Sequence, residues 1–188
     1  MEEIAKYIFE AGMLKRTARS GWWAEKVRHP ESVADHCFRA AVVAFILARM
    51  EGHDKDFARK LCTAAVFHDM HEARLGDMNK ITQRYINMKE HEDKVEEDQV
   101  GKMPEEIGKS ILSVLDDLSD GERKILKDAD YLECAFQAKE YSDIGHEGAN
   151  SWLESIEGRL QTKSAKALMG QLKRQDSNSW WKGLKKIE

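Results

Sequence analysis

The most informative segment of this chain is Ala64-Ala65-Val66-Phe67-His68-Asp69-Met70-His71-Glu72-Ala73-Arg74-Leu75-Gly76-Asp77. At about 100° per residue of helix, His68, Asp69 and Glu72 lie on one flank. Burying an imidazole and two carboxylates without partners would cost on the order of 2–7 kcal/mol for each polar group. A bound metal ion would offset that cost. We therefore expect other parts of the chain to supply further ligands.

Composition and charge restrict the class of protein. The chain has 188 residues and only 2 prolines, and it is rich in helix-forming residues, which favours an all-α fold in one domain. The formal net charge of -4 argues against a nucleic-acid or membrane partner. The longest apolar run, 40–48, is about half as long as a membrane span. The first residues lack the basic region of a signal peptide, and the three cysteines lack CxxC spacing, so we expect reduced thiols in a cytoplasmic protein.

Hydrophobic periodicity predicts helices along almost the whole chain. A long loop, 16–30, follows the first of them, and loops of this length are often functional. The C-terminal tail, 180–186, mixes tryptophan and lysine and is expected to pack on its own domain or at a dimer contact. The expected helices are 2–14, 33–51, one from Asp54 to a stop at Gly76, 80–100, a short one after Pro104, 122–141, 149–160 and 164–172.

Two further polar residues occur on apolar helices. His36 lies on the most apolar helix, and Asp130 lies beside the apolar stripe of another, where an aspartate is seldom buried without a partner. With His68 and Asp69 they complete a set of two histidines and two carboxylates on three helices. Such a mixed set suits one divalent ion, Mn²⁺, Co²⁺, Fe²⁺, Ni²⁺ or Zn²⁺. His71 points to a different flank, and we expect it to be solvated or to support a ligand.

This ordered set resembles the HD-domain metal-dependent phosphohydrolases, and within them the 5′-deoxynucleotidase branch. The similarity runs from about Leu14 to Tyr141. It implies an HD-domain helical bundle with a long loop after the first helix, a single domain over 1–188 with a core at about 14–141 and C-terminal helices in 149–188, and a homodimer. The segments that carry the resemblance are Arg19-Ser20-Gly21-Trp22, Arg28-His29-Pro30-Glu31-Ser32-Val33-Ala34-Asp35-His36, His68-Asp69 with Glu72 and Gly76-Asp77, and Lys127-Asp128-Ala129-Asp130.

Four residues outside the ligand set are expected to act on the substrate. Helix spacing puts Glu72 beside the ligands, and the resemblance assigns the family's essential proton-transfer glutamate to this position. Arg19 offers a guanidinium for phosphate. Trp22 offers a flat wall, which by resemblance faces the deoxyribose and disfavours a 2′-hydroxyl; the offset from His36 in the family pattern selects it over Trp23. By resemblance Asp77 takes the 3′-hydroxyl, although it could instead cap the following helix.

The predicted function is hydrolysis of 2′-deoxyribonucleoside 5′-monophosphates to deoxyribonucleoside and phosphate by attack of a metal-bound water. The substrate is thus a small-molecule nucleotide. A second enzyme hypothesis is an HD-fold pyrophosphohydrolase that acts on another nucleotide, such as guanosine tetraphosphate. An HD-fold nucleotide sensor without catalysis is the non-enzyme hypothesis. The sequence disfavours that sensor because all four ligand positions and Glu72 are filled.

Overall fold

The computed structural model of the protein describes residues 1–87 and 89–184. Over these residues the chain is a series of helices without a strand, so the predicted all-α fold is confirmed. An isolated antiparallel bridge between Ala18 and Ser32 closes the base of the long loop. The helices are α1 (Glu2–Ala11), α2 (Val33–Met50), α3 (Lys55–Phe67), α4 (Glu72–Leu75), α5 (Lys89–Val100), α6 (Glu105–Asp116), α7 (Asp120–Asp143), α8 (Asn150–Glu157) and α9 (Lys163–Leu172), with short 3₁₀ helices at Gly12–Lys15, Ser20–Trp23, Thr82–Arg84 and Glu147–Ala149.

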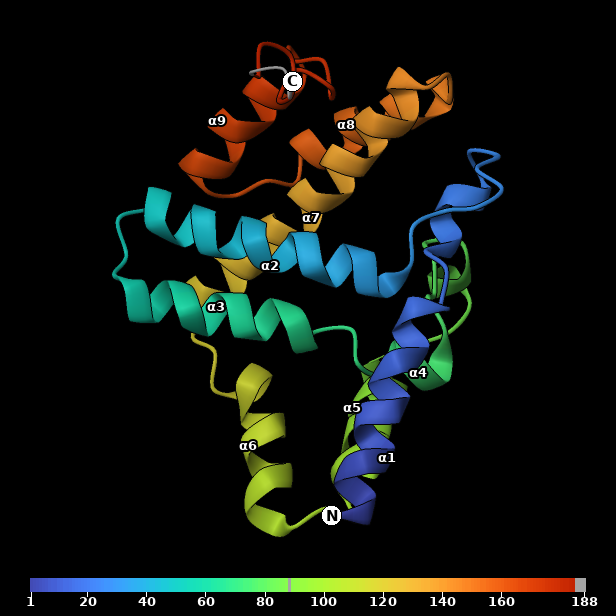
Figure 1. Ribbon diagram of the computed structural model, residues 1–188, viewed down its shortest axis with the longest axis vertical. Coiled ribbons are helices and arrows are strands. Elements are labelled where there is room, and N and C mark those ends of the chain that lie inside the picture. Colours follow the sequence, from blue (N-terminus) through green and yellow to red (C-terminus); the bar gives the residue numbers. More distant parts are fainter. Residues whose placement is uncertain (88, 185–188) are drawn as a thin grey trace.

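Helices α2 and α3 lie side by side at the centre of the molecule, and α7 packs behind them (Figure 1). Leu47, Leu61 and Leu132, one from each of these helices, are fully buried in the main apolar cluster. Helices α8 and α9 extend this cluster at one end of the molecule. A smaller cluster around Tyr7 and Met70 holds α1, α5 and α6 at the other end. The three central helices therefore form the rigid frame on which any site must be built.

Capping explains where the central helices begin. Ser32 and Asp35 form a capping box at the start of α2, as the sequence predicts. Asp54 caps α3 through the backbone N–H of Phe57. Ser119 caps α7 in a second capping box, so this helix starts at Asp120, two residues before its predicted start. The sequence Ser-Asp-Gly at 119–121 therefore marks the start of α7, shortly after the preceding helix ends.

The prediction of one continuous helix from Asp54 to Gly76 is wrong. Helix α3 ends at Phe67, and a turn over 68–71 separates it from the short α4. Backbone bonds within this turn span three residues, such as Met70 N–H to Phe67 C=O at 3.1 Å. His68 and His71 keep right-handed helical backbone angles, which is why the helical periodicity continues through the break. The side chains of His68 and Asp69 therefore lie just beyond the end of α3, where they can face an open space.

Other boundaries also differ from prediction. The first α-helix ends at Ala11 and continues as a 3₁₀ helix, and the loop 16–30 contains the 3₁₀ helix Ser20–Trp23. The charged helix starts at Lys89 instead of near residue 80, because a turn and a short 3₁₀ helix occupy the interval. In the tail, Trp180 and Trp181 are largely exposed, while residues 185 and 186 lie outside the described residues. Within the described chain no helix has the length and apolar character to cross a membrane.

Candidate metal centre

Four side chains from three helices converge at one point, as the sequence predicts. His36 comes from α2, His68 and Asp69 from the end of α3, and Asp130 from α7. His36 Nε2 lies 3.3 Å from His68 Nε2, 3.4 Å from Asp130 Oδ1 and 3.6 Å from Asp69 Oδ2, and His68 Nε2 lies 3.3 Å from that Asp69 oxygen. Four ligands placed tetrahedrally at about 2.1 Å from one ion would be about 3.4 Å apart. These four separations therefore match those around a single divalent metal ion.

A buried charge network orients His36. Its Nδ1 contacts Oε2 of Glu133, and both side chains are completely buried. Glu133 Oε1 accepts a hydrogen bond from Arg39 Nε at 2.9 Å, and Arg39 also pairs with Glu140 at 2.8 Å. This contact leaves Nε2 of His36 directed at the other ligands, the usual arrangement for a histidine that binds metal. Burial opposes a charge on the ring, but bonds to Asp130 and Glu133 raise the pKa of His36 to about 10.

Sequence reasoning missed Glu133 and Arg39. A detectable signal exists, because Glu133 lies between Leu132 and Cys134, three residues after Asp130, on a helix whose neighbouring positions are apolar. A glutamate is almost never fully buried unless it is paired. The pattern could therefore have indicated a buried partner for a histidine or arginine on another helix.

The two carboxylates of the candidate donor set, Asp69 and Asp130, are held in their charged form. Burial opposes ionisation of Asp130, but the hydrogen bond to His36 and the charge of Lys127 hold its pKa well below the usual range. Lys127 Nζ lies 2.6 Å from Asp130 Oδ2. The pKa of Asp69 is also lowered, because His68, His36 and Arg19 outweigh its burial. Both carboxylates are therefore ionised at neutral pH, as metal ligands must be.

Glu72 lies beside Asp69, with a carboxylate oxygen of each within 4.8 Å of the other. It is the first residue of α4 and is 9% exposed. Burial, followed by the charges of Asp69 and Asp77, raises the pKa of Glu72 to about 9. Its Oε2 is buried and has no hydrogen-bond partner among the described residues. An unpartnered buried oxygen is costly, so this carboxyl is placed for a group that the protein itself does not provide.

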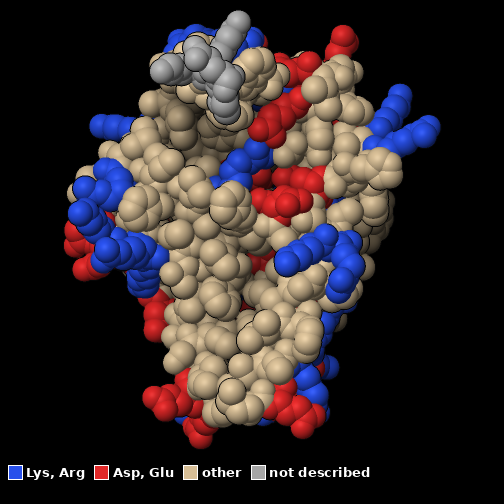
Figure 2. All heavy atoms as spheres, in the orientation of Figure 1, with Lys and Arg blue, Asp and Glu red and all other residues tan. Residues whose placement is uncertain are grey.

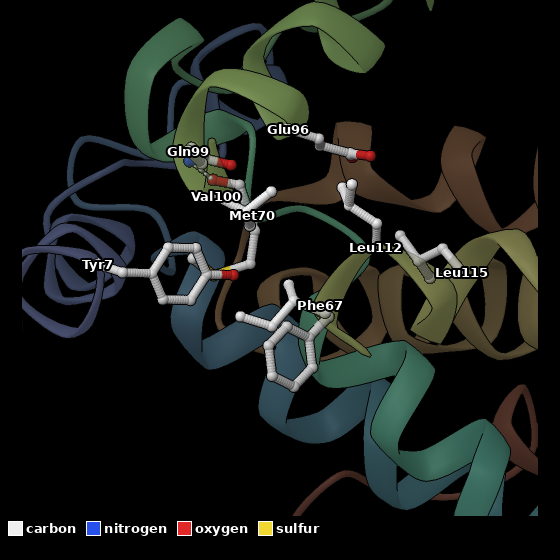
Figure 3. A pocket seen from close by; sticks show the side chains of 9 residues that line it. Tyr7, Phe67, Met70, Glu96, Gln99, Val100, Leu112 and Leu115 are labelled. Carbon is white, nitrogen blue, oxygen red and sulfur yellow. Dashed lines mark hydrogen bonds between the residues drawn. The ribbon is translucent and has the colours of Figure 1, made fainter. Parts of the chain in front are cut away.

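The turn that carries His68 and Asp69 is supported from behind. Gln99 of α5 donates a hydrogen bond to the carbonyl of Met70 at 3.0 Å. Beside Met70, Tyr7 and Phe67 border a cavity of about 20 Å³ (Figure 3). This volume suits one water molecule at most. His71, the histidine not expected to be a ligand, turns toward α5, where its Nδ1 lies 3.2 Å from Glu96.

A hollow of about 360 Å³ opens in front of the ligands; we call it the ligand hollow. Arg19 lines it and lies 3.3 Å from Asp77 and 3.8 Å from Asp69. Asp77 also lines it, and its Oδ2 accepts bonds from the backbone N–H and hydroxyl of Ser20 at 2.6 and 2.7 Å. Asp77 thus ties the long loop to the segment after α4 and does not cap the next helix. Lys127, which sequence reasoning also missed, lines the same hollow.

The expectation that Trp22 forms a wall of the site needs correction. Its side chain is 1% exposed and lines neither the ligand hollow nor the hollow beside it. Its ring stacks on Trp152 of α8, with centroids 4.4 Å apart, and its Nε1 donates to Glu31 at 3.0 Å. Trp152, and not Trp22, therefore lines the ligand hollow. Trp23, the neighbouring tryptophan, is exposed and lines the second hollow.

The fold and the site define a class of helical proteins that place a His, His-Asp, Asp donor set on three packed helices. A family model described as HD domain matches residues 11–173. The chain belongs to the HD-domain family, as the resemblance predicted.

Individual relatives agree with this assignment. A Bos taurus protein named 5′-deoxynucleotidase HDDC2 is 32% identical, over 84% of this chain and 73% of its own. A crystal structure from a genomics project is 39% identical with a TM-score of 0.81, covering 96% of this chain and 99% of the other. A cyanophage S-2L HD phosphohydrolase bound to dA and one catalytic Zn²⁺ ion shares the fold at 17% identity, with a TM-score of 0.60 over 88% of this chain and 94% of its own.

The contact between His36 and Glu133 generates the first prediction. Replacing Glu133 with glutamine removes the charge that orients His36, and we expect a loss of about 10- to 100-fold in affinity for a divalent ion. Titration calorimetry with Mn²⁺ or Zn²⁺ on the chelator-treated protein measures this affinity. Glu140→Gln, which changes only the exposed partner of Arg39, is the matched control. Equal affinities in the two variants would contradict the orienting role.

Proposed function

We propose that this protein hydrolyses 2′-deoxyribonucleoside 5′-monophosphates to deoxyribonucleoside and phosphate with the help of one divalent metal ion. The observation that carries the proposal is the convergence of four donor side chains: His36 Nε2 lies 3.3–3.6 Å from donor atoms of His68, Asp69 and Asp130, and these three residues line the ligand hollow. The name of the Bos taurus relative, 5′-deoxynucleotidase, supports the choice of substrate. A deoxynucleotidase with this ligand set would be a phosphomonoesterase.

The four converging residues would hold the ion. Two imidazoles and two carboxylates suit Mn²⁺, Co²⁺, Fe²⁺, Ni²⁺ or Zn²⁺. When bound, such an ion lowers the pKa of coordinated water and polarises a phosphoryl oxygen. The raised pKa of His36 favours a positive charge on its ring beside Asp69 and Asp130, and binding of the ion would replace that proton.

Two cations of the ligand hollow would bind the phosphate. Arg19 is held by Asp77 and Asp69, and its guanidinium can bind two phosphate oxygens at once. Lys127 is held beside Asp130 and adds a second positive charge at the same hollow. The two cations come from the long loop and from α7. The phosphate would therefore be bound between elements that the fold holds fixed.

Glu72 would move the proton. Its carboxyl lines the ligand hollow beside the ligands, and an ion in the site would lower its raised pKa toward neutrality. In its ionised form it accepts a proton from the attacking water as the oxygen of that water bonds to phosphorus. The bond to the 5′-oxygen breaks, and the protonated carboxyl can return the proton to that leaving oxygen. Asp77, whose Oδ1 is only partly engaged by Arg19, would accept the 3′-hydroxyl of the sugar.

We also infer a homodimer, formed through α2. Four apolar side chains recur on one flank of this helix and are each exposed by 44–73%. Figure 2 shows a continuous uncharged area over α2 and α3. A second copy of the same apolar flank would cover it without leaving a charge unpaired. The four residues are Phe38, Val42, Ile46 and Met50.

Cys37, Cys62 and Cys134 are free thiols, which is consistent with the cytoplasmic location that we expect.

A phosphate-release assay tests the proposed activity. The purified protein is given deoxyribonucleoside and ribonucleoside 5′-monophosphates, the 3′-monophosphates and guanosine tetraphosphate, with chelator and then with each divalent metal. We expect release only from the deoxy 5′-monophosphates, and none with chelator or in Asp69→Asn. Equal hydrolysis of ribonucleotides would contradict the sugar selectivity. Pyrophosphate release from guanosine tetraphosphate would favour the pyrophosphohydrolase hypothesis. Nucleotide binding without hydrolysis would favour the sensor hypothesis.

A substitution separates the two roles that Glu72 could have. Glu72→Gln keeps the shape of the side chain but cannot accept a proton, so we expect kcat to fall at least about 100-fold while metal affinity is kept. Kinetics and metal analysis of the same sample measure both quantities. Glu96→Gln, which alters only the partner of His71, is the matched control. Loss of metal from Glu72→Gln would indicate that Glu72 only supports the ligands.

The inferred dimer has its own test. The double substitution Phe38→Glu and Ile46→Glu places charges on the exposed flank of α2 and should produce a monomer in sedimentation equilibrium. Ile144→Glu, at an exposed position beyond α7, is the control and should stay dimeric. A monomeric unsubstituted protein would contradict the inference.

A further inference from the structure

A second hollow of about 650 Å³ adjoins the ligand hollow; we call it the side hollow. Residues of α7, α8, the 3₁₀ helix Ser20–Trp23 and the segment after α4 line it. The two hollows share six lining residues and are therefore adjacent. The shared residues are Gly21, Asn79, Lys80, Tyr131, Cys134 and Trp152. None of the proposed metal ligands lines the side hollow, so the reaction described above does not use this space.

The indole of Trp152 belongs to the wall that the two hollows share, and three contacts fix its position. Its ring stacks on the buried ring of Trp22, with an angle of 26° between the planes. Its Nε1 donates a hydrogen bond to Glu25 Oε1 at 2.9 Å. A Cβ on Gly21 would come within 2.8 Å of the ring, so only glycine allows this approach. The side chain is nevertheless half-buried, which leaves part of the ring exposed to the hollows.

A second aromatic ring belongs to the same wall. Tyr131 lies on α7 directly after Asp130, and it lines both hollows. Two cations flank its ring: Lys127 Nζ at 4.9 Å and the guanidinium of Arg159 at 5.9 Å from the centroid. The cation–π contacts restrict the ring further. The wall therefore consists of two aromatic side chains whose positions are set before any ligand binds.

We propose that the side hollow is the nucleobase subsite and that Trp152 provides its stacking contact, an inference that rests on the proposed function. A nucleotide whose phosphate lies between the ligands and Arg19 can extend past Trp152 and Tyr131, which line both hollows, toward the side hollow. A flat aromatic base can stack on such rings. Helix α8 then supplies an aromatic contact to the base, whereas the contact expected from Trp22 was to the deoxyribose.

The chemistry of the wall predicts how bases are recognised. Every nucleobase has a π-face, so stacking tolerates different bases. The hydroxyls of Ser151 and Ser155 on α8 and the guanidinium of Arg159, just after α8, are on exposed residues that water can also satisfy. Recognition should therefore depend on the presence of a base more than on its identity.

The test compares substrates with and without a base on the metal-loaded protein. The unsubstituted protein should hydrolyse dAMP and dTMP with similar kcat/KM, and both at least about 10-fold better than 2-deoxyribose 5-phosphate. Trp152→Leu should raise KM for the nucleotides about 10-fold, with kcat and the activity on the sugar phosphate unchanged. Trp180→Ala, which removes an exposed tryptophan of the tail, is the control.

A second variant guards against misfolding of Trp152→Leu. Ser155→Trp fills the side hollow from an exposed position of α8 and leaves the apolar core intact. It should lose the preference for nucleotides and keep the activity on 2-deoxyribose 5-phosphate. Equal kcat/KM for the nucleotides and the sugar phosphate in the unsubstituted protein, or a preference for nucleotides that persists in Ser155→Trp, would overturn the inference.

The proposed function can fail separately from this inference. If no phosphate is released from any substrate, the function is wrong, and the subsite is then tested by binding alone. Deoxyadenosine, which has no phosphate, should quench the tryptophan fluorescence of the unsubstituted protein and not that of Ser155→Trp after correction for the added indole. Absence of quenching in the unsubstituted protein would overturn the subsite.

Discussion

The contact between His36 and Glu133 is the interaction on which the arrangement of the central helices depends. Both side chains are completely buried, one on α2 and one on α7. An isolated buried carboxylate or imidazolium is strongly unfavourable. The two helices must therefore pack in the one register that joins these groups and brings Arg39 to the far side of Glu133. In that register Asp130, one helical turn before Glu133, faces Nε2 of His36.

The end of α3 allows the site to face the ligand hollow. A helix that continued through His68 and Asp69 would keep its neighbouring turns packed against α2. Because the chain turns after Phe67, both side chains project beyond the helix end, and Glu72 returns toward them at the start of α4. Gln99 holds the turn in place through the carbonyl of Met70. The position of the ligands thus depends on a helix end that a periodic pattern alone does not reveal.

The sequence was sufficient to predict the all-α fold and the convergence of the four ligand positions. Both follow from local signals, namely apolar periodicity, capping residues and polar side chains on apolar helices. The break after Phe67 was missed because the turn keeps helical backbone angles. Trp22 was misplaced because its partner Trp152 lies 130 residues later, and no local pattern indicates which ring covers the other. Contacts between distant segments decide which aromatic side chain faces a hollow.

Helix α7 connects the ligand site to the C-terminal helices. Asp128 is fully buried and accepts hydrogen bonds from the backbone N–H groups of Gln161 and Thr162, which fixes the segment between α8 and α9 on α7. Two residues later, Asp130 faces the other ligands, and Tyr131 lines both hollows. Because one rigid helix carries all three residues, the distance between the ligands and the wall that α8 supplies is set by folding. The C-terminal helices are therefore part of the site's architecture, although the residues that carry the family resemblance all precede them.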